Sequence, residues 1–260
     1  MKNVLLIIDP QNDFCLPTGS LYVKGADKDM ERLASFILKN IEHIDEIHVS
    51  RDMHNYDDIA HARYWKNFNG ELPKPFTNIT VDDMKNGIWT TAKEEDYEIA
   101  LKYLQTLKDK NKFTHTIWPD HCVHGTTGFQ LFPALNDVLN IWEGKTEKSY
   151  IVYVKGMNRN TEHFGMFQTE DDSEEFNEQA FRNIFSKADN VFVSGEAKSH
   201  CVATSLQQIM ERDSEMISKI TLLTDATSDV EGLGHLASPI YKKLRAKGMK
   251  ENTTIEITLD

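Results

Sequence analysis

Three side chains with complementary chemistry stand where predicted strands end. Asp9 and Lys155 each close an apolar run, and Cys201 follows the turn after another such run. An acid, an amine and a thiol that converge in one crevice could act as a base, a cationic helper and a nucleophile. The run from Val202 onward predicts a helix that begins at Cys201. We therefore expect the helix dipole to favour a thiolate and the backbone N–H groups of the turn to form an oxyanion hole.

Each of these residues also has a purely structural interpretation. Asp9 could terminate a strand, since Pro10 follows it, and Lys155 could be a solvated lysine before Gly156. A lone buried cysteine is usually a small hydrophobic residue. The turn and helix around Cys201 favour a chemical role, and neither Cys15 nor Cys122 has so clear a setting.

A second group of residues has the composition of a metal site. Asp52 and His54 are two residues apart, which places them on the same side of an extended chain, and His121 follows a later apolar run. One carboxylate and two imidazoles, with positions left open, suit a catalytic divalent ion such as Zn²⁺, Fe²⁺ or Mn²⁺. Additional ligand candidates are His61, His124 and Cys122. The alternative is that these are ordinary loop residues of a chain with 10 histidines.

The elements that must position these groups alternate along the chain. Strands are predicted at Val4–Asp9, Glu46–Ser50, Thr114–Trp118, Tyr150–Lys155, Asn190–Gly195 and Ile220–Asp225, with a further edge strand at Thr254–Leu259. Helices are predicted near 27–43, 93–111, 129–142, 174–187, 200–213 and 236–247. Such alternation predicts an α/β fold with three αβα layers around a mostly parallel six-stranded sheet. In the strand order 3-2-1-4-5-6, the first, fourth and fifth strands would be neighbours.

One stretch, at about 62–113, breaks this alternation. It carries a cluster of prolines and aromatic residues around Leu72–Phe76. We interpret it as an insertion in a single domain of residues 1–260, because no repeat, low-complexity tract or Gly/Ser linker marks a second domain. We expect residues near 62–76, with Trp65 among them, to pack over the metal ligands and Trp118; a surface elaboration or a subunit contact is the alternative.

Composition narrows the class of partner. The 260 residues include 41 acidic and 29 basic side chains, a formal net charge of −12, which disfavours binding to nucleic acid or to an anionic membrane. No apolar run reaches the roughly 20 residues needed to cross a bilayer, and the N-terminal run meets Asp9 where a signal peptide would have small residues. With only three cysteines, we expect a cytoplasmic protein. The oligomeric state stays open, a homo-oligomer included.

The motifs around these residues resemble those of the isochorismatase-like cysteine hydrolases, and within that family the nicotinamidases. The resemblance rests on Leu6-Ile-Ile-Asp-Pro-Gln-Asn-Asp-Phe14, Asp52-x-His54, Trp118-Pro-x-His121-Cys-Val-x-Gly-Thr126, Val154-Lys-Gly156 and Gly195-x-Ala-x-x-x-Cys-Val202. It implies that Asp9, Lys155 and Cys201 are a catalytic triad and that Asp52, His54 and His121 bind the metal. It further implies a cis peptide bond between Glu196 and Ala197, an oxyanion hole made by the N–H groups of Ala197 and Cys201, and a pyridine ring held between Phe14 and Trp118.

The chain departs from this family pattern at three places. The segment between the metal-binding motifs is longer than in compact nicotinamidases, which resembles a long-insert, nicotinamidase-related subfamily. Glu196 stands where an aliphatic residue is usual, and His200 where Tyr, His or Val occur; both are expected to border the substrate.

The resemblance implies a metal-dependent cysteine amidohydrolase that deamidates nicotinamide to nicotinate and ammonia through a thioester. The alternative is a related cysteine hydrolase acting on another carboxamide or on a carbamoyl or ureido substrate, whose known representatives generally lack the Asp-x-His and His set. A true isochorismatase is disfavoured because it has no cysteine at the position of Cys201. A non-catalytic interaction module is disfavoured because all three triad residue types are present.

Overall fold

A parallel β-sheet forms the centre of the protein. The computed structural model describes residues 1–259. Its six-stranded sheet has the order β5-β2-β1-β6-β7-β8, and every neighbouring pair is parallel. The strands are β1 (Asn3–Ile8), β2 (Glu46–Asp52), β5 (Ile151–Lys155), β6 (Asn190–Gly195), β7 (Ile220–Leu223) and β8 (Lys250–Asn252). Because the central strand β1 is buried along its whole length, it reads as a continuous apolar run after its first residue.

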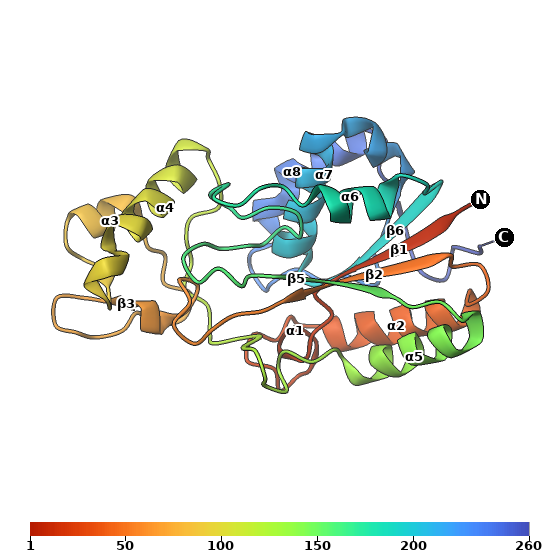
Figure 1. The fold of residues 1–260 in the computed structure, drawn as a ribbon, viewed down its shortest axis with the longest axis horizontal. Helices are drawn as coiled ribbons and strands as arrows, with labels where there is room; N and C mark the ends of the chain where they lie inside the picture. Colours follow the sequence, from red (N-terminus) through yellow and green to blue (C-terminus); the bar gives the residue numbers. More distant parts are fainter. Residues whose placement is uncertain (260) are drawn as a thin grey trace.

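Helices cover both faces of the sheet (Figure 1). One face carries α2 (Ala26–Lys39) and α5 (Pro133–Thr146), and the other carries α6 (Glu178–Phe185), α7 (Ala203–Arg212) and α8 (Gly234–Ala246). Alternate residues of β1 enter two separate hydrophobic clusters: Leu5 and Ile7 pack with α2 and α5, whereas Leu6 and Ile8 pack with α7 and α8. The three-layer α/β architecture predicted from the sequence is confirmed. No helix among residues 1–259 is long and apolar enough to span a bilayer.

The predicted strand order 3-2-1-4-5-6 holds for the strands that the sheet contains, but two of the expected strands are wrong. Thr114–Trp118 is not a strand of this sheet: Thr116 and Trp118 form only isolated bridges, to Asn78 and His61. The third strand along the chain is therefore β5, which pairs with β2 and not with β1. Thr254–Leu259 is a turn and coil, and β8 lies just before it. Apolar content predicted both segments, whereas backbone pairing decided against them.

The helices lie close to the predicted ranges. Besides the five on the sheet, α4 (Tyr97–Asp109) corresponds to the helix expected near 93–111. Short elements fill the rest: α1 (Asn12–Cys15), η1 (Ala62–Tyr64), β3 (Trp65–Lys66), α3 (Val81–Lys85), β4 (Thr90–Thr91), η2 (Glu94–Asp96), η3 (Lys198–Val202) and η4 (Ser214–Lys219). The antiparallel pair β3–β4 stands apart from the main sheet, on the side where α3 and α4 project (Figure 1).

The segment between β2 and Trp118 has a hydrophobic cluster of its own. Buried residues of α3 and α4 pack there with Ile59, Tyr64 and Trp65. Trp65 is 0% exposed, and its indole Nε1 donates to the Ile59 carbonyl at 2.8 Å. The expectation that Trp65 covers the site is therefore wrong: it is a core residue of this segment. Phe76 instead reaches Trp118, with the two rings nearly perpendicular and 5.9 Å between centroids.

We predict that Trp65→Ala destabilises the protein by about 3–5 kcal/mol, because it empties a fully buried site and leaves the Ile59 carbonyl without its donor. Phe76→Ala is the matched control, since Phe76 is 55% exposed and should change the free energy of unfolding by less than about 1 kcal/mol. Urea unfolding of both variants measures the difference. Equal losses would mean that Trp65 is not part of a cooperative core.

Candidate active site

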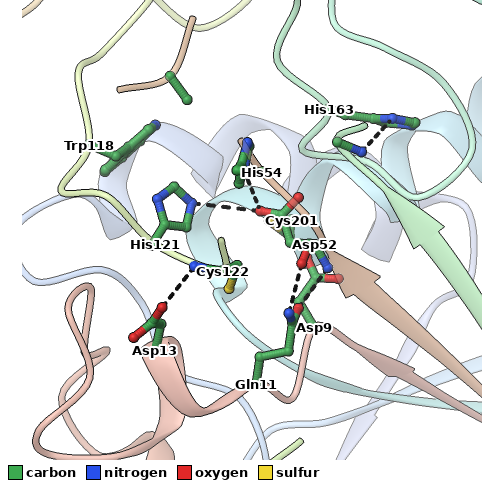
Figure 2. A network of polar contacts seen from close by, with 12 residues as sticks. Asp9, Gln11, Asp13, Asp52, His54, Trp118, His121, Cys122, His163 and Cys201 are labelled. Atoms are coloured by element: carbon green, nitrogen blue, oxygen red, sulfur yellow. Dashed lines mark hydrogen bonds and ion pairs between the residues drawn. The ribbon is translucent and has the colours of Figure 1, made fainter. Parts of the chain in front are cut away.

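A buried lysine connects the residues at the carboxyl ends of the strands. Lys155 Nζ lies 3.0 Å from Asp9 Oδ2, 3.0 Å from Asp52 Oδ1 and 3.8 Å from Cys201 Sγ. It also donates to the His163 carbonyl at 2.7 Å. Figure 2 shows that Asp9, Asp52 and Cys201 lie close together. The structure thus brings together the acid, the amine and the thiol that the sequence singled out.

The positions of these groups follow from the parallel sheet. Asp9 comes directly after β1, Asp52 ends β2 and Lys155 ends β5, so all three lie at one edge of the sheet. Lys155 belongs to the strand beside β2, so its side chain reaches past Asp52 to Asp9. Gly156 makes room for this arrangement: a Cβ there would lie 2.7 Å from Asp52 Oδ1, and its φ of +82° suits glycine.

Charge and burial act against each other in this cluster. Burial opposes a charged amine, but the Asp52 and Asp9 carboxylates outweigh it and hold the pKa of Lys155 well above its ordinary value. Burial raises the pKa of Asp9, and the Lys155 ammonium offsets only part of that effect. Ser50 helps to fix Asp9: its hydroxyl donates to Oδ1 at 2.6 Å. The side chain of Lys155 therefore stays positively charged.

The thiol does not have the low pKa that the sequence suggested. Burial raises the pKa of Cys201 well above its ordinary value, although the Lys155 ammonium acts in the opposite direction. Cys201 also lies within the π-helical turn η3 and not at the first residue of α7. The expectation of a lowered thiol pKa is therefore wrong, because burial outweighs the Lys155 ammonium.

The three predicted metal ligands converge in the adjacent space. One ligand atom from each of Asp52, His54 and His121 lies within 4.8 Å of the other two, and all three residues are buried. His54 Nε2 is 3.0 Å and His121 Nε2 is 3.7 Å from Asp52 Oδ2. Figure 2 shows both imidazoles facing this carboxylate. A carboxylate oxygen and two imidazole nitrogens are a donor set for Zn²⁺, Fe²⁺ or Mn²⁺.

The other nitrogen of each imidazole faces an oxygen of the protein, the kind of contact that orients metal-binding histidines. Asp58 Oδ2 lies 3.2 Å from His54 Nδ1, and the Pro119 carbonyl lies 2.9 Å from His121 Nδ1. Both contacts leave Nε2 as the free ligand atom. The residues present therefore fit a divalent ion.

The additional ligand candidates lie outside this set. His61 Nε2 approaches His121 Nδ1 at 3.2 Å, so it contacts a ligand and does not join the three. His124 is exposed. Cys122 is buried in the hydrophobic cluster beneath α2 and α5, and its backbone N–H donates to Asp13 Oδ2 at 2.7 Å.

A narrow cavity of about 30 Å³ opens onto the thiol and the metal ligands. Most of its wall is apolar and aromatic. Its lining consists of Phe14, Leu21, Val23, Asp52, Trp118, His121, Glu162, Phe164, Ala197, His200, Cys201 and Val230. Four of the five residues expected to bind substrate, namely Phe14, Trp118, Ala197 and His200, are among them. This mostly apolar lining with a few polar groups is typical of small-molecule sites.

Glu196 is the exception. Its side chain is fully buried but does not line the cavity; Oε2 instead accepts a hydrogen bond from the Ser228 N–H at 3.1 Å. The expectation that Glu196 borders the substrate is wrong, because the backbone turn directs its side chain beneath the cavity. The peptide bond from Glu196 to Ala197 is cis, as the family resemblance implied. Within residues 1–259, no partner is found for the Ala197 N–H.

Two lining residues were missed from the sequence. Glu162 accepts a hydrogen bond from Trp118 Nε1 at 3.1 Å, and burial raises the pKa of its carboxyl to about 8. Phe164 packs against both Trp118 and His200. The only signal was their place in the loop that follows Lys155 at the carboxyl end of β5.

Comparisons with known proteins agree with this geometry. No family model matches the chain. The nicotinamidase of Saccharomyces cerevisiae is 23% identical over 245 residues, which span 93% of this chain and 95% of the relative. The yeast nicotinamidase structure superposes with a TM-score of 0.68 at 20% identity and covers 96% of this chain and 98% of its own.

Two further solved structures have the same fold. A nicotinamidase/pyrazinamidase of Acinetobacter baumanii has a TM-score of 0.67 at 19% identity, with 99% of this chain and 98% of that chain covered. The pyrazinamidase of Pyrococcus horikoshii, solved in complex with zinc, has a TM-score of 0.57 at 16% identity, with 97% and 99% covered.

The chain thus shares its α/β fold with these nicotinamidase structures and with a solved isochorismatase-like hydrolase. The curated relative and these solved structures are nicotinamidases, the proteins that the motifs of this chain resemble.

We predict that Asp58→Asn weakens divalent-metal binding by about 10–100-fold, because the carboxylate no longer orients His54. Asp57→Asn is the matched control, since the neighbouring Asp57 carboxylate faces Lys93 and Arg159 instead. Zinc titration with a competing chelator measures both affinities. Identical affinities in the two variants would contradict the role of Asp58.

We predict that iodoacetamide modifies Cys201 before Cys15 and Cys122, because Cys201 alone of the three lines the cavity. Since the pKa of Cys201 is raised, the labelling rate should keep increasing from about pH 7 to about pH 9. Peptide mapping by mass spectrometry identifies the labelled cysteine at each pH. A rate that is already constant at pH 7 would show a resting thiolate.

Proposed function

We propose that the chain is a metal-dependent cysteine amidohydrolase that converts nicotinamide to nicotinate and ammonia. The observation that carries this proposal is the contact of Lys155 with Asp9, Asp52 and Cys201, which connects a nucleophile and its base to a metal-ligand set at one cavity. The names of the yeast and Acinetobacter relatives support the choice of substrate.

Acylation begins with a proton transfer. Asp9 takes the proton of the Cys201 thiol, and Sγ attacks the carboxamide carbon to form a C–S bond. The N–H groups of Ala197 and Cys201 stabilise the resulting oxyanion, a contribution of about 3–4 kcal/mol for a single donor in comparable sites. Asp9 then returns the proton to the amide nitrogen, the C–N bond breaks and ammonia leaves a thioester.

Deacylation reverses the proton flow. Asp9 accepts a proton from a water molecule while the water oxygen attacks the thioester carbon. The C–S bond then breaks, and Asp9 returns the proton to the Cys201 thiolate. Lys155 stays charged throughout and stabilises the carboxylate form of Asp9 and the thiolate form of Cys201.

The remaining groups position the substrate. Phe14 and Trp118 supply aromatic faces for the pyridine ring, and His200 borders it. Asp52, His54 and His121 would hold the metal, which would supply a Lewis acid for the ring nitrogen or for a bound water. Zn²⁺ is the favoured ion, supported by the zinc complex of the Pyrococcus pyrazinamidase; the same donors accept Fe²⁺ or Mn²⁺.

We also infer that residues 1–260 work as one hydrolase domain with residues at about 62–113 as an insertion, and that the enzyme acts in the cytoplasm. The three free cysteines support a reducing compartment. Phe76, at the end of the aromatic stretch, contacts Trp118. Phe113, near the end of the insertion, contacts His200. These contacts support a role for the insertion in shaping the cavity entrance.

We predict that the purified protein releases ammonia faster from nicotinamide than from benzamide or a ureido compound. Benzamide lacks the ring nitrogen that the metal would polarise, and a ureido compound lacks the aromatic ring that would lie between Phe14 and Trp118. Cys201→Ala should lower kcat at least about 10³-fold by removing the nucleophile, whereas Cys15→Ala, a buried cysteine outside the cavity, should retain it. Coupled ammonia detection measures each rate. Turnover of the ureido compound alone would indicate the alternative hydrolase activity.

A further inference from the structure

A second pair of acids lies beneath the turn that carries Ala197 and Cys201. Glu196 is 0% exposed, and its Oε1 has no hydrogen-bond partner within residues 1–259. Asp29, in the first turn of α2, is 2% exposed. The two carboxyl groups lie within hydrogen-bond reach of each other, although the two residues are far apart in the sequence.

Ser228 bridges the two acids. Its backbone N–H donates to Glu196 Oε2 at 3.1 Å, and its hydroxyl donates to Asp29 Oδ2 at 2.5 Å. Arg32 Nη2 donates to the other oxygen of Asp29 at 2.5 Å. Two buried carboxylates in contact cannot both stay ionised, so one of them must hold a proton.

The surroundings decide which acid holds it. The Asp29 carboxylate accepts hydrogen bonds from an arginine and a hydroxyl and lies in the first turn of α2. No salt bridge joins Glu196 to a cation among the described residues: Arg32 pairs with Asp29 instead, and the titratable groups that interact with Glu196 include Asp29, Asp229, Cys15 and Tyr241. Burial, and then the charge of Asp29, hold the pKa of Glu196 well above its ordinary value.

We propose that Glu196 is protonated and donates a hydrogen bond to the Asp29 carboxylate, and that this acid pair positions the turn that carries Ala197 and Cys201. The pair joins α2, the loop after β7 and the turn after β6 through Ser228. The catalytic part of this inference rests on the proposed amidase function, whereas the protonation of Glu196 does not. Glu196 acts through the turn and is a positioning residue.

The protonation has a defined effect on stability. Because the pKa of Glu196 is raised in the folded protein, its contribution is fully present below the pKa of the unfolded chain, about 4.3, and is lost as pH rises through the folded value. Glu196→Gln cannot titrate, yet its amide can donate to Asp29 and accept from Ser228. The Tm of Glu196→Gln minus that of the wild type should therefore increase from pH 5 upward, by about 3–5 °C per pH unit.

Calorimetry between pH 5 and pH 8 measures this difference without any substrate. Parallel Tm curves for wild type and Glu196→Gln would overturn the protonation. Glu170→Gln is the matched control for a buried glutamate: burial raises the pKa of Glu170 to about 7, but its side chain lies at a different cleft. It should change the Tm curve without changing kcat.

Activity on nicotinamide tests the positioning role. Glu196→Leu removes the hydrogen bond to Asp29 and leaves the Ser228 N–H without its acceptor, so kcat should decrease by about tenfold with little change in KM. Glu196→Gln should restore most of this loss. A Glu196→Leu enzyme with wild-type kcat would overturn the positioning role, and a wild type without activity on any amide would overturn the proposed function while the Tm result still stands.

Discussion

The ammonium group of Lys155 is the interaction on which the rest of the site depends. Its side chain is 2% exposed and lies 3.0 Å from a carboxylate on either side, those of Asp9 and Asp52. Moving an ammonium ion out of water costs several kcal/mol, so this lysine stays charged only because both acids face it. Without it, two buried carboxylates would repel each other at the point where the nucleophile and the metal ligands meet. The Lys155 ammonium thus allows the Asp9 carboxylate and the Asp52 carboxylate to lie close together in a buried site.

The same balance determines the resting state of the nucleophile. The Lys155 ammonium lies 3.8 Å from Cys201 Sγ and lowers the pKa of the thiol. Burial and the carboxylates of Asp9 and Asp52 raise this pKa, and the effect of burial is the largest, so the thiol stays protonated. A neutral thiol is less prone to unwanted modification than a thiolate. In the mechanism that we propose, proton transfer from Cys201 to Asp9 is therefore part of each turnover.

The segment between β2 and Trp118 contains its own hydrophobic cluster and also packs against residues that line the site. Its own hydrophobic cluster, with Trp65 at the centre, lies apart from the sheet. Within the segment, however, Phe76 packs against Trp118, and Phe113, close to its end, packs against His200 and Phe164. Residues of this segment therefore pack behind Trp118, Phe164 and His200, three residues that line the cavity.

The sequence by itself determined the α/β class, the residue types at the strand ends and the metal-ligand set, because apolar runs and short motifs are local properties. The Asp9, Lys155 and Cys201 group and the Asp52, His54 and His121 group both converge as those motifs indicated. Only the tertiary structure decided that β5 pairs with β2 and that Thr114–Trp118 stays outside the sheet, because strand partners are chosen by long-range pairing. It also decided that Glu196 lies beneath the cavity and that Cys201 keeps its proton, because burial and the balance of neighbouring charges exist only in the folded chain.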